Sequence, residues 1–381
     1  ARISNKYFGD NYLVFHSNEG NIEKQTLSKP PFDPIIPENS EAKSDFSKRI
    51  SEIPNRESKL RFIEFKRGFS KNNDVNFSDI LNRTTLYHTH NPINSIFDLT
   101  LSYGVGNLQI PQLEQTTEIL NLLGTENYSF NEFKSRLQKI GTTISFDSDK
   151  NYLRINVKGF DKYFVESVKY LNEFMSNVKG DDSKIKILTD NAESSRKIEN
   201  EQPATIGRAL RDFVMLGQDS YYLRRMSVDE IEKSNSEDYI NYFNEAMNYE
   251  LDILYTGQLE LKDVSKTIKN NLSLNKKPIK SNSPLDVKSK KYDKDKVYLV
   301  NDSDAVQSQI YFSVSGNKIN SLERSTSRAY NKYFGSGMSS IVFQEIREFR
   351  SLAYSSWGYF ITPYRNGGDG NFMGYVGCQA D

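Results

Sequence analysis

The chain has 381 residues, 36% hydrophobic and 12% aromatic, which is enough for two or three domains with packed cores. Lysine plus arginine and aspartate plus glutamate both number 50, so no long-range positive field is available to attract nucleic acid or anionic lipid. The single cysteine, Cys378, excludes an internal disulfide framework, and no apolar run reaches the length of a membrane span.

The first 75 residues lack the periodic hydrophobic pattern of a domain. The run from Lys29 to Pro37 contains four prolines, each of which restricts itself and the residue before it, so we expect an extended chain here. Polar sequence continues from Glu38 to Arg61 and is interrupted by Pro54. A long linker that wraps over another body is the simplest interpretation.

From about residue 80 the sequence predicts regular structure. Residues 84–90 and 96–103 are rich in β-prone side chains and flank an Asn-Pro turn, which predicts an antiparallel hairpin. A helix is expected from Pro111 to Gly124, and the Ser129-to-Glu132 spacing predicts a capping box at the next helix. The further elements expected in this unit are strands at 142–147, 151–158 and 251–255, helices at 161–178 and to about 271, and mostly helical sequence over 182–247.

A second unit follows a domain boundary. Residues 272–295 are rich in lysine, carry two prolines and show no periodicity. Beyond them the sequence predicts strands near 296–300, 307–314, 352–363 and 370–379, with helices near 320–333 and 339–349. Since a sheet whose last strand has no cover is an unusual end for a domain, we expect this unit to be incomplete. Both units read as α+β, with helices grouped on one face of a sheet.

Few residues could carry catalysis unaided. His88 and His90 share one face of a predicted strand, but neither a third ligand nor a supporting carboxylate stands at a recognisable spacing. A surface or half-buried pair is the plainer interpretation. Cys378 has no histidine near it, and Gly335-Ser336-Gly337 lacks the Lys-Ser/Thr that completes a phosphate loop.

Residues 333–354 resemble the insulinase/pitrilysin family of zinc peptidases. They contain Gly-Met-Ser-Ser, Phe-Gln-Glu-Ile-Arg-Glu and Leu-Ala-Tyr in the family's order, and the resemblance extends over about 76–381. One departure is Ser351, where the family usually has glycine, so we expect a shift in the turn that aims Tyr354. The leader with Lys29-Pro30-Pro31-Phe32 is also similar to the linker between the two halves of bacterial members.

The segment from Asn94 to Thr125 resembles the family's zinc-binding hairpin and helix, which carries His-x-x-Glu-His and ends in Gly-Thr. Anchoring on Gly124-Thr125 puts Gln115 and Ile119 at the two histidine positions, which share a helix face. Glu118 keeps the position of the glutamate that activates zinc-bound water, but it has no such water to activate.

The family's third zinc ligand matches either Glu193 or Arg196 in this sequence. With this motif degenerate, the resemblance implies no metal in this chain. Ordinary exposed helix carboxylates are the plainer interpretation of Glu118 and Glu193.

The resemblance also implies a domain arrangement with two similar units. Residues 1–75 would be the tail of a preceding half and an extended linker, and 76–275 a first peptidase-like α+β domain with the degenerate helix. Residues 276–295 would link it to a second, truncated domain at 296–381. Each domain would be a largely antiparallel sheet with helices on one face.

In the family, two halves close like a clamshell on a peptide, and the non-catalytic half contributes an arginine and a tyrosine seven residues apart. Arg347 and Tyr354 stand at that spacing. Arginine can hold a peptide carbonyl, and a tyrosine hydroxyl can donate to a developing oxyanion. By residue type alone, Arg347 would be a helix-end arginine paired with a glutamate and Tyr354 a core aromatic.

The resemblance implies a non-catalytic half that positions unfolded peptide for a zinc-bearing partner half, on the same chain or a separate one. The charge balance and the short apolar runs indicate no nucleic-acid partner and no membrane span, and the resemblance favours a periplasmic or envelope location. The alternative is an inactive homologue that serves as a peptide-binding or scaffold protein. A hydrolase with a metal site on His88 and His90 is a third possibility, for which a general base and a third ligand are lacking.

Overall fold

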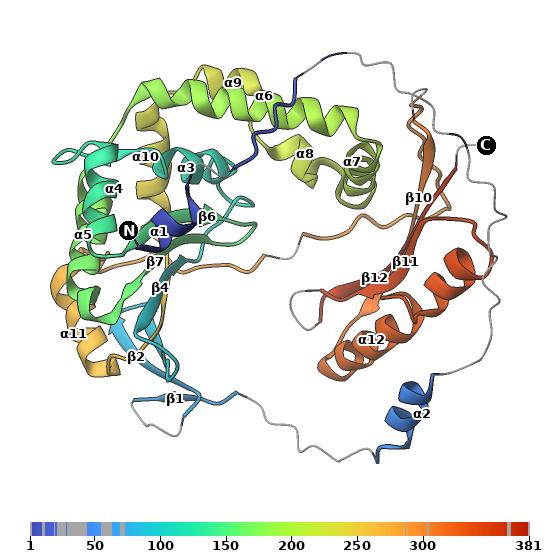
Figure 1. Cartoon of the computed structure of the whole chain (residues 1–381), viewed down its shortest axis with the longest axis horizontal. Coiled ribbons are helices and arrows are strands. Elements are labelled where there is room, and N and C mark those ends of the chain that lie inside the picture. The colour runs from blue at the N-terminus through green and yellow to red at the C-terminus, as the bar shows by residue number, and fades with distance from the viewer. Residues whose placement is uncertain are drawn as a thin grey trace. The chain divides into compact units, whose positions relative to one another are not determined.

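The computed structural model describes residues 2–9, 12–18, 20, 28, 44–54, 63–68, 73–285, 287–302, 305–363 and 367–379, which divide into two compact units, residues 1–56 and 57–381. The first unit contains two short helices, α1 (Arg2–Tyr7) and α2 (Asp45–Glu52) (Figure 1). Ser44 caps α2 by accepting a hydrogen bond from the backbone N–H of Ser47 at 3.1 Å. The proline run at 29–37 that predicted an extended linker lies outside the described residues.

A seven-stranded sheet organises the described part of the second unit up to residue 257. All neighbouring strands in it are antiparallel except β1–β2 and β3–β9, so the predicted α+β class with a largely antiparallel sheet is confirmed. In spatial order its strands are β1 (Phe65–Arg67), β2 (Val75–Leu81), β3 (Thr84–His90), β9 (Leu251–Gly257), β4 (Ile96–Tyr103), β7 (Leu153–Phe160) and β6 (Thr143–Ser148). A separate pair joins β5 (Gly124–Thr125) to β8 (Val178–Lys179).

The predicted hairpin between 84–90 and 96–103 is wrong, although both strands form. Strand β9 lies between them, parallel to β3 and antiparallel to β4. Side chains of β9 alternate between buried and exposed, and Leu251, Ile253 and Tyr255 lie on the face that packs into the core. A central position in the sheet buries these three side chains. Strand β9 begins at Leu251, far along the chain from β4, which ends at Tyr103. The residues of the Asn-Pro turn between β3 and β4 therefore give no indication of it.

Helices cover this sheet and complete its core. Helices α3, α5 and α11 contact the sheet, and α10 packs on α3. The predicted capping box is present, because Ser129 and Glu132 satisfy each other's backbone N–H groups at the start of α4. The helices are α3 (Leu113–Leu120), α4 (Phe130–Lys139), α5 (Phe164–Asn177), α6 (Ile185–Glu201), α7 (Pro203–Leu216), α8 (Tyr221–Arg224), α9 (Val228–Glu232), α10 (Ser236–Ala246) and α11 (Leu261–Asn271), with single 3-10 turns at Asp161–Tyr163, Asp182–Lys184 and Gly217–Asp219.

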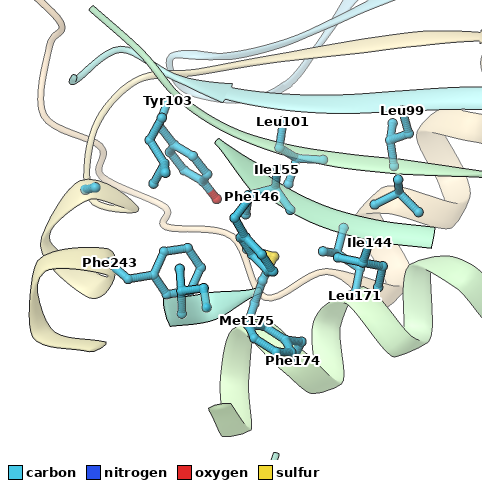
Figure 2. Packing of buried hydrophobic residues seen from close by; sticks show 14 of the residues in the cluster. Leu99, Leu101, Tyr103, Ile144, Phe146, Ile155, Leu171, Phe174, Met175 and Phe243 are labelled. Carbon is cyan, nitrogen blue, oxygen red and sulfur yellow. The ribbon is translucent and has the colours of Figure 1, made fainter. Parts of the chain in front are cut away.

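Aromatic rings fill much of the space between the sheet and these helices. Figure 2 shows Phe146 of β6 among Phe174 of α5 and Phe243 of α10. The Phe146 ring centroid lies 4.8 Å from that of Phe174 and 5.8 Å from that of Phe243, the latter edge-on. Such pairs add to the stabilisation that burial of the aliphatic residues supplies.

A three-stranded antiparallel sheet follows, in the order β10 (Gln307–Lys318), β12 (Asp369–Gln379), β11 (Ser355–Ile361). Helix α12 (Ser321–Phe334) packs on β11. A π-helix, η4 (Phe343–Glu348), lies between α12 and β11 in the sequence. The strand predicted near 296–300 is wrong: Val297 and Leu299 alternate as in a strand, but both are largely exposed and join no ladder of the described residues. None of the described helices is long and apolar enough to cross a membrane.

Candidate functional site

Helix α3 carries the degenerate zinc motif, and its two histidine positions are buried. Gln115 is 7% exposed and Ile119 is fully buried in the core. The Gln115 Oε1 atom has no hydrogen-bond partner among the described residues. Asn121 fixes the end of this helix to β6, donating to the Phe146 carbonyl at 2.9 Å and accepting from the Phe146 N–H at 3.1 Å. The face that would need two imidazoles therefore presents an amide and a butyl group to the core.

Glu118 points away from that buried face and is exposed. Its pKa is raised, first by partial desolvation and then by the nearby Glu114 carboxylate. A carboxyl that holds its proton more readily suits a general base near neutral pH. On the neighbouring face Gln115 and Ile119 stand at the two histidine positions, so no imidazole there can hold a metal-bound water.

Helix α6 supplies both candidates for the third-ligand position. Glu193 is exposed, whereas Arg196 is half-buried and donates to the Met226 carbonyl. The pKa of Arg196 is lowered, by burial and then by the Arg225 guanidinium, and Glu114 acts on it in the opposite direction. A guanidinium beside α3 repels a metal ion, so Arg196 opposes a zinc site.

A polar network beside α3 was not predicted from the sequence. Arg225 donates two hydrogen bonds to Glu199, at 3.1 and 2.6 Å, and its guanidinium lies 5.5 Å from the Tyr221 ring centroid. The Tyr221 hydroxyl donates to Glu114 Oε1 at 2.6 Å, and burial followed by this bond raises the pKa of Tyr221 to about 12. The partners are 26 and 107 residues apart, so no local spacing could reveal them.

His88 and His90 differ in how deeply they are buried. His88 is 1% exposed, its Nε2 lies 2.7 Å from the Leu259 carbonyl oxygen, and its ring stacks on Tyr255. His90 is exposed at the end of the strand. Among the described residues no three His, Cys, Asp or Glu side chains gather as a metal site would require. His88 is a packed core residue.

Arg347 and Tyr354 lie in contact at the end of the π-helix η4. The Arg347 guanidinium carbon is 4.5 Å from the Tyr354 ring centroid and 4.8 Å from that of Phe343, so two aromatic rings hold it. Its Nε also lies 3.5 Å from Glu348 Oε1. Tyr354 is 72% exposed, which excludes the core-aromatic interpretation and leaves its hydroxyl open to solvent.

The backbone near this pair adopts one unusual conformation, at Ser351, and makes one close approach, at Gly335. The Ser351 N–H donates to the Arg347 carbonyl at 3.1 Å, and Ser351 has a φ of 51°, a left-handed conformation that favours glycine. At the end of α12, a Cβ on Gly335 would lie 1.6 Å from the Gly358 carbonyl oxygen, so only glycine lets the helix end approach β11 this closely.

The fold is α+β, and Gln115 and Ile119 occupy the two positions where the predicted zinc motif would have histidines. Residues 250–381 match the family model described as the peptidase M16 inactive domain. The predicted resemblance to the non-catalytic halves of the insulinase/pitrilysin family is thereby confirmed, and the matched region includes Arg347 and Tyr354. No curated protein matches the sequence significantly.

Solved structures share the fold at low identity. A protease from Helicobacter pylori matches with a TM-score of 0.63 and 15% identity, over 80% of this chain and 75% of its own. A peptidase M16 inactive domain from Pseudomonas fluorescens matches with a TM-score of 0.62 and 14% identity, over 81% and 75%. The periplasmic protease PqqL from Escherichia coli matches with a TM-score of 0.64 and 14% identity over 78% of this chain, which spans 33% of PqqL.

Proposed function

We propose that this chain is the non-catalytic half of a clamshell zinc metallopeptidase, and that it encloses and positions unfolded peptide for a zinc-bearing half. The observation that carries the proposal is the contact between Arg347 and Tyr354 within the matched inactive domain. The degenerate α3 supports it, because a chain with Gln115 and Ile119 at the histidine positions needs its metal from elsewhere.

Arg347 and Tyr354 are placed so that both can bind a peptide next to the bond that is cleaved. The Phe343 and Tyr354 rings in contact with it restrict the Arg347 side chain, so it loses less conformational freedom when it binds a carbonyl oxygen. Tyr354 places its phenol in solvent beside that cation, where the hydroxyl can donate a hydrogen bond to a developing oxyanion. Neither group can cleave a peptide without a metal-activated water from the partner half.

The location proposed for this chain is the periplasm or cell envelope. It is supported by the fold shared with PqqL, which is described as a periplasmic protease.

The test is a reconstitution with the zinc-bearing half and an unfolded peptide, in which kcat/KM is measured. Arg347→Ala should lower kcat/KM by about 100-fold, and Tyr354→Phe by about 10- to 100-fold, since each removes one stabilising contact to the transition state. Arg350→Ala is the matched control, because Arg350 is an exposed arginine of the same block whose partner is Glu345.

The unfolding midpoint of each variant shows whether the fold has survived. Wild-type turnover in Arg347→Ala would contradict the proposal. If peptide still bound to that variant and no catalytic half restored cleavage, the alternative of a peptide-binding or scaffold homologue would take its place.

A further inference from the structure

A pocket of about 860 Å³ opens where the ends of several elements of the first sheet and its helices meet. Strands β2 and β4, helices α5, α10 and α11, and the segment after α11 contribute to it. Its volume lies within the range of about 300–1,000 Å³ that is usual for small-molecule sites. Its apolar wall consists of Ile80, Leu81, Met175, Met247, Leu272 and Leu274.

One polar side chain lies deep in this wall. Tyr103, the last residue of β4, is 2% exposed and lines the pocket, and no hydrogen bond to its hydroxyl is formed by any described residue. Figure 2 shows Tyr103 at the side of the core where Phe243 and Met175 lie. Burial raises the pKa of Tyr103, so the hydroxyl stays protonated and can donate. A hydroxyl that lines the pocket and has no partner among the described residues is available to donate to a ligand oxygen.

Two cations stand at the mouth. Lys269 and Lys276 line the pocket and are exposed, and neither forms an ion pair with a described residue. The rim between them is fixed, because Asn275 Nδ2 donates to Asn248 Oδ1 at 2.9 Å and Asn275 Oδ1 accepts from the Lys277 N–H at 2.9 Å. None of the described residues that line the pocket is acidic.

We propose that this pocket binds a small amphipathic carboxylate with an apolar body about as long as a medium-chain fatty acid. Its carboxylate lies at Lys269 and Lys276, its chain lies along the apolar wall, and an oxygen at its far end accepts the hydrogen bond of Tyr103. Each part of the ligand is matched by one feature of the pocket. The lysines at the mouth match the carboxylate, the apolar wall matches the chain, and the Tyr103 hydroxyl matches the far oxygen. This site is independent of the Arg347–Tyr354 pair, so its test does not depend on peptide cleavage.

The test is calorimetric titration of the full chain with dodecanoate, decanoate, 12-hydroxydodecanoate and neutral 1-dodecanol, each below its aggregation concentration. Decanoate should bind more than tenfold more weakly than dodecanoate, because about four-fold in Kd is lost with each methylene that leaves the pocket. The 12-hydroxy acid should bind about 2- to 10-fold more tightly than dodecanoate, and Tyr103→Phe should abolish that preference.

Removing the two lysine charges tests whether the mouth of the pocket binds the carboxylate. Lys269→Gln with Lys276→Gln should weaken both dodecanoate acids several-fold and leave 1-dodecanol unchanged. Lys266→Gln is the matched control, an exposed lysine of α11 that does not line the pocket.

Three outcomes would overturn the proposal. One is dodecanoate binding that falls equally in the control and in the mouth variants. Another is binding of dodecyltrimethylammonium as tight as that of dodecanoate. The third is the absence of dodecanoate binding altogether. Leu274→Trp, which fills the pocket from its half-buried wall, should abolish binding in either charge background.

Discussion

Ser351 holds a left-handed backbone conformation, with a φ of 51°, between the π-helix and β11. Serine is one of the residues that reach this region only at a cost, whereas glycine reaches it freely. The family's usual glycine at this position thus has a physical reason that this chain overrides. The turn before Tyr354 holds a conformation that suits glycine, and the expected shift in the aim of Tyr354 stays a prediction.

Ser351→Gly should therefore raise the free energy of unfolding. The gain is expected to be about 1 kcal/mol or less, because the relieved strain is partly offset by the larger freedom of glycine in the unfolded chain. Urea unfolding would measure it. Ser325→Gly in α12 is the control and should have the opposite sign, losing about 0.5 kcal/mol in a helix interior. A loss at Ser351 equal to that at Ser325 would show that the turn stores no strain.

The raised pKa of Glu118 has a consequence for stability against pH. A carboxyl whose pKa is higher in the folded state contributes stability below its unfolded pKa, and that contribution is lost as pH rises through the folded pKa. Glu118→Gln should thus leave stability unchanged near pH 3 and raise it at pH 7. Because Glu118 is exposed and screened, the gain should be only a few tenths of a kcal/mol.

Glu132 provides the opposite case for the same measurement. Its pKa is lowered, first by the hydrogen bond from the Ser129 side chain and then by that from the Ser129 backbone. Glu132→Gln should therefore lose stability at pH 7 and not near pH 3. Parallel behaviour of the two variants across this range would contradict both assignments.

At the scale of elements, local signals were sufficient where the determinants lie within one segment. The Ser129–Glu132 capping box and the strand at 251–255 depend on neighbouring residues, and both were predicted. The insertion of β9 between β3 and β4 was not, since pairing depends on residues far apart. The same reason hides the Arg225–Glu199 and Tyr221–Glu114 contacts.

Helix α3 illustrates how far a degenerate motif departs from a metal site. Ile119 is fully buried, so Ile119→His places a polar ring in the core and should destabilise the protein by about 2–5 kcal/mol. The double variant Gln115→His with Ile119→His should still hold no stoichiometric zinc, because Glu193 is exposed and Arg196 brings positive charge beside α3. Zinc content and thermal unfolding would measure both effects. One tight zinc in the double variant would show that α6 already supplies the third ligand.

At the scale of the whole molecule, the sequence predicted the α+β class from its pattern of strands and helices and the family resemblance mainly from residues 333–354, while the roles of Arg347 and Tyr354 stay a prediction. It could not predict that the two side chains stack, because the π-helix that carries Arg347 is set by packing against β11. The division into residues 1–75, 76–275, 276–295 and 296–381 stays a prediction. Contacts such as the Ser281 Oγ bond to the Gly104 carbonyl, at 2.6 Å, already fasten part of the predicted linker to the first sheet.

Zinc bound per chain, measured after dialysis against metal-free buffer, tests the reading of the whole chain as a non-catalytic half. We expect well below one zinc per chain and no peptide cleavage, since the described residues include no cluster of three metal-binding side chains. Cleavage should then appear when the zinc-bearing half is added, and it should fall with Arg347→Ala. One tightly held zinc per chain would contradict this assignment. His90→Ala would then be the first variant to make, because His90 is exposed whereas His88 is packed against Tyr255.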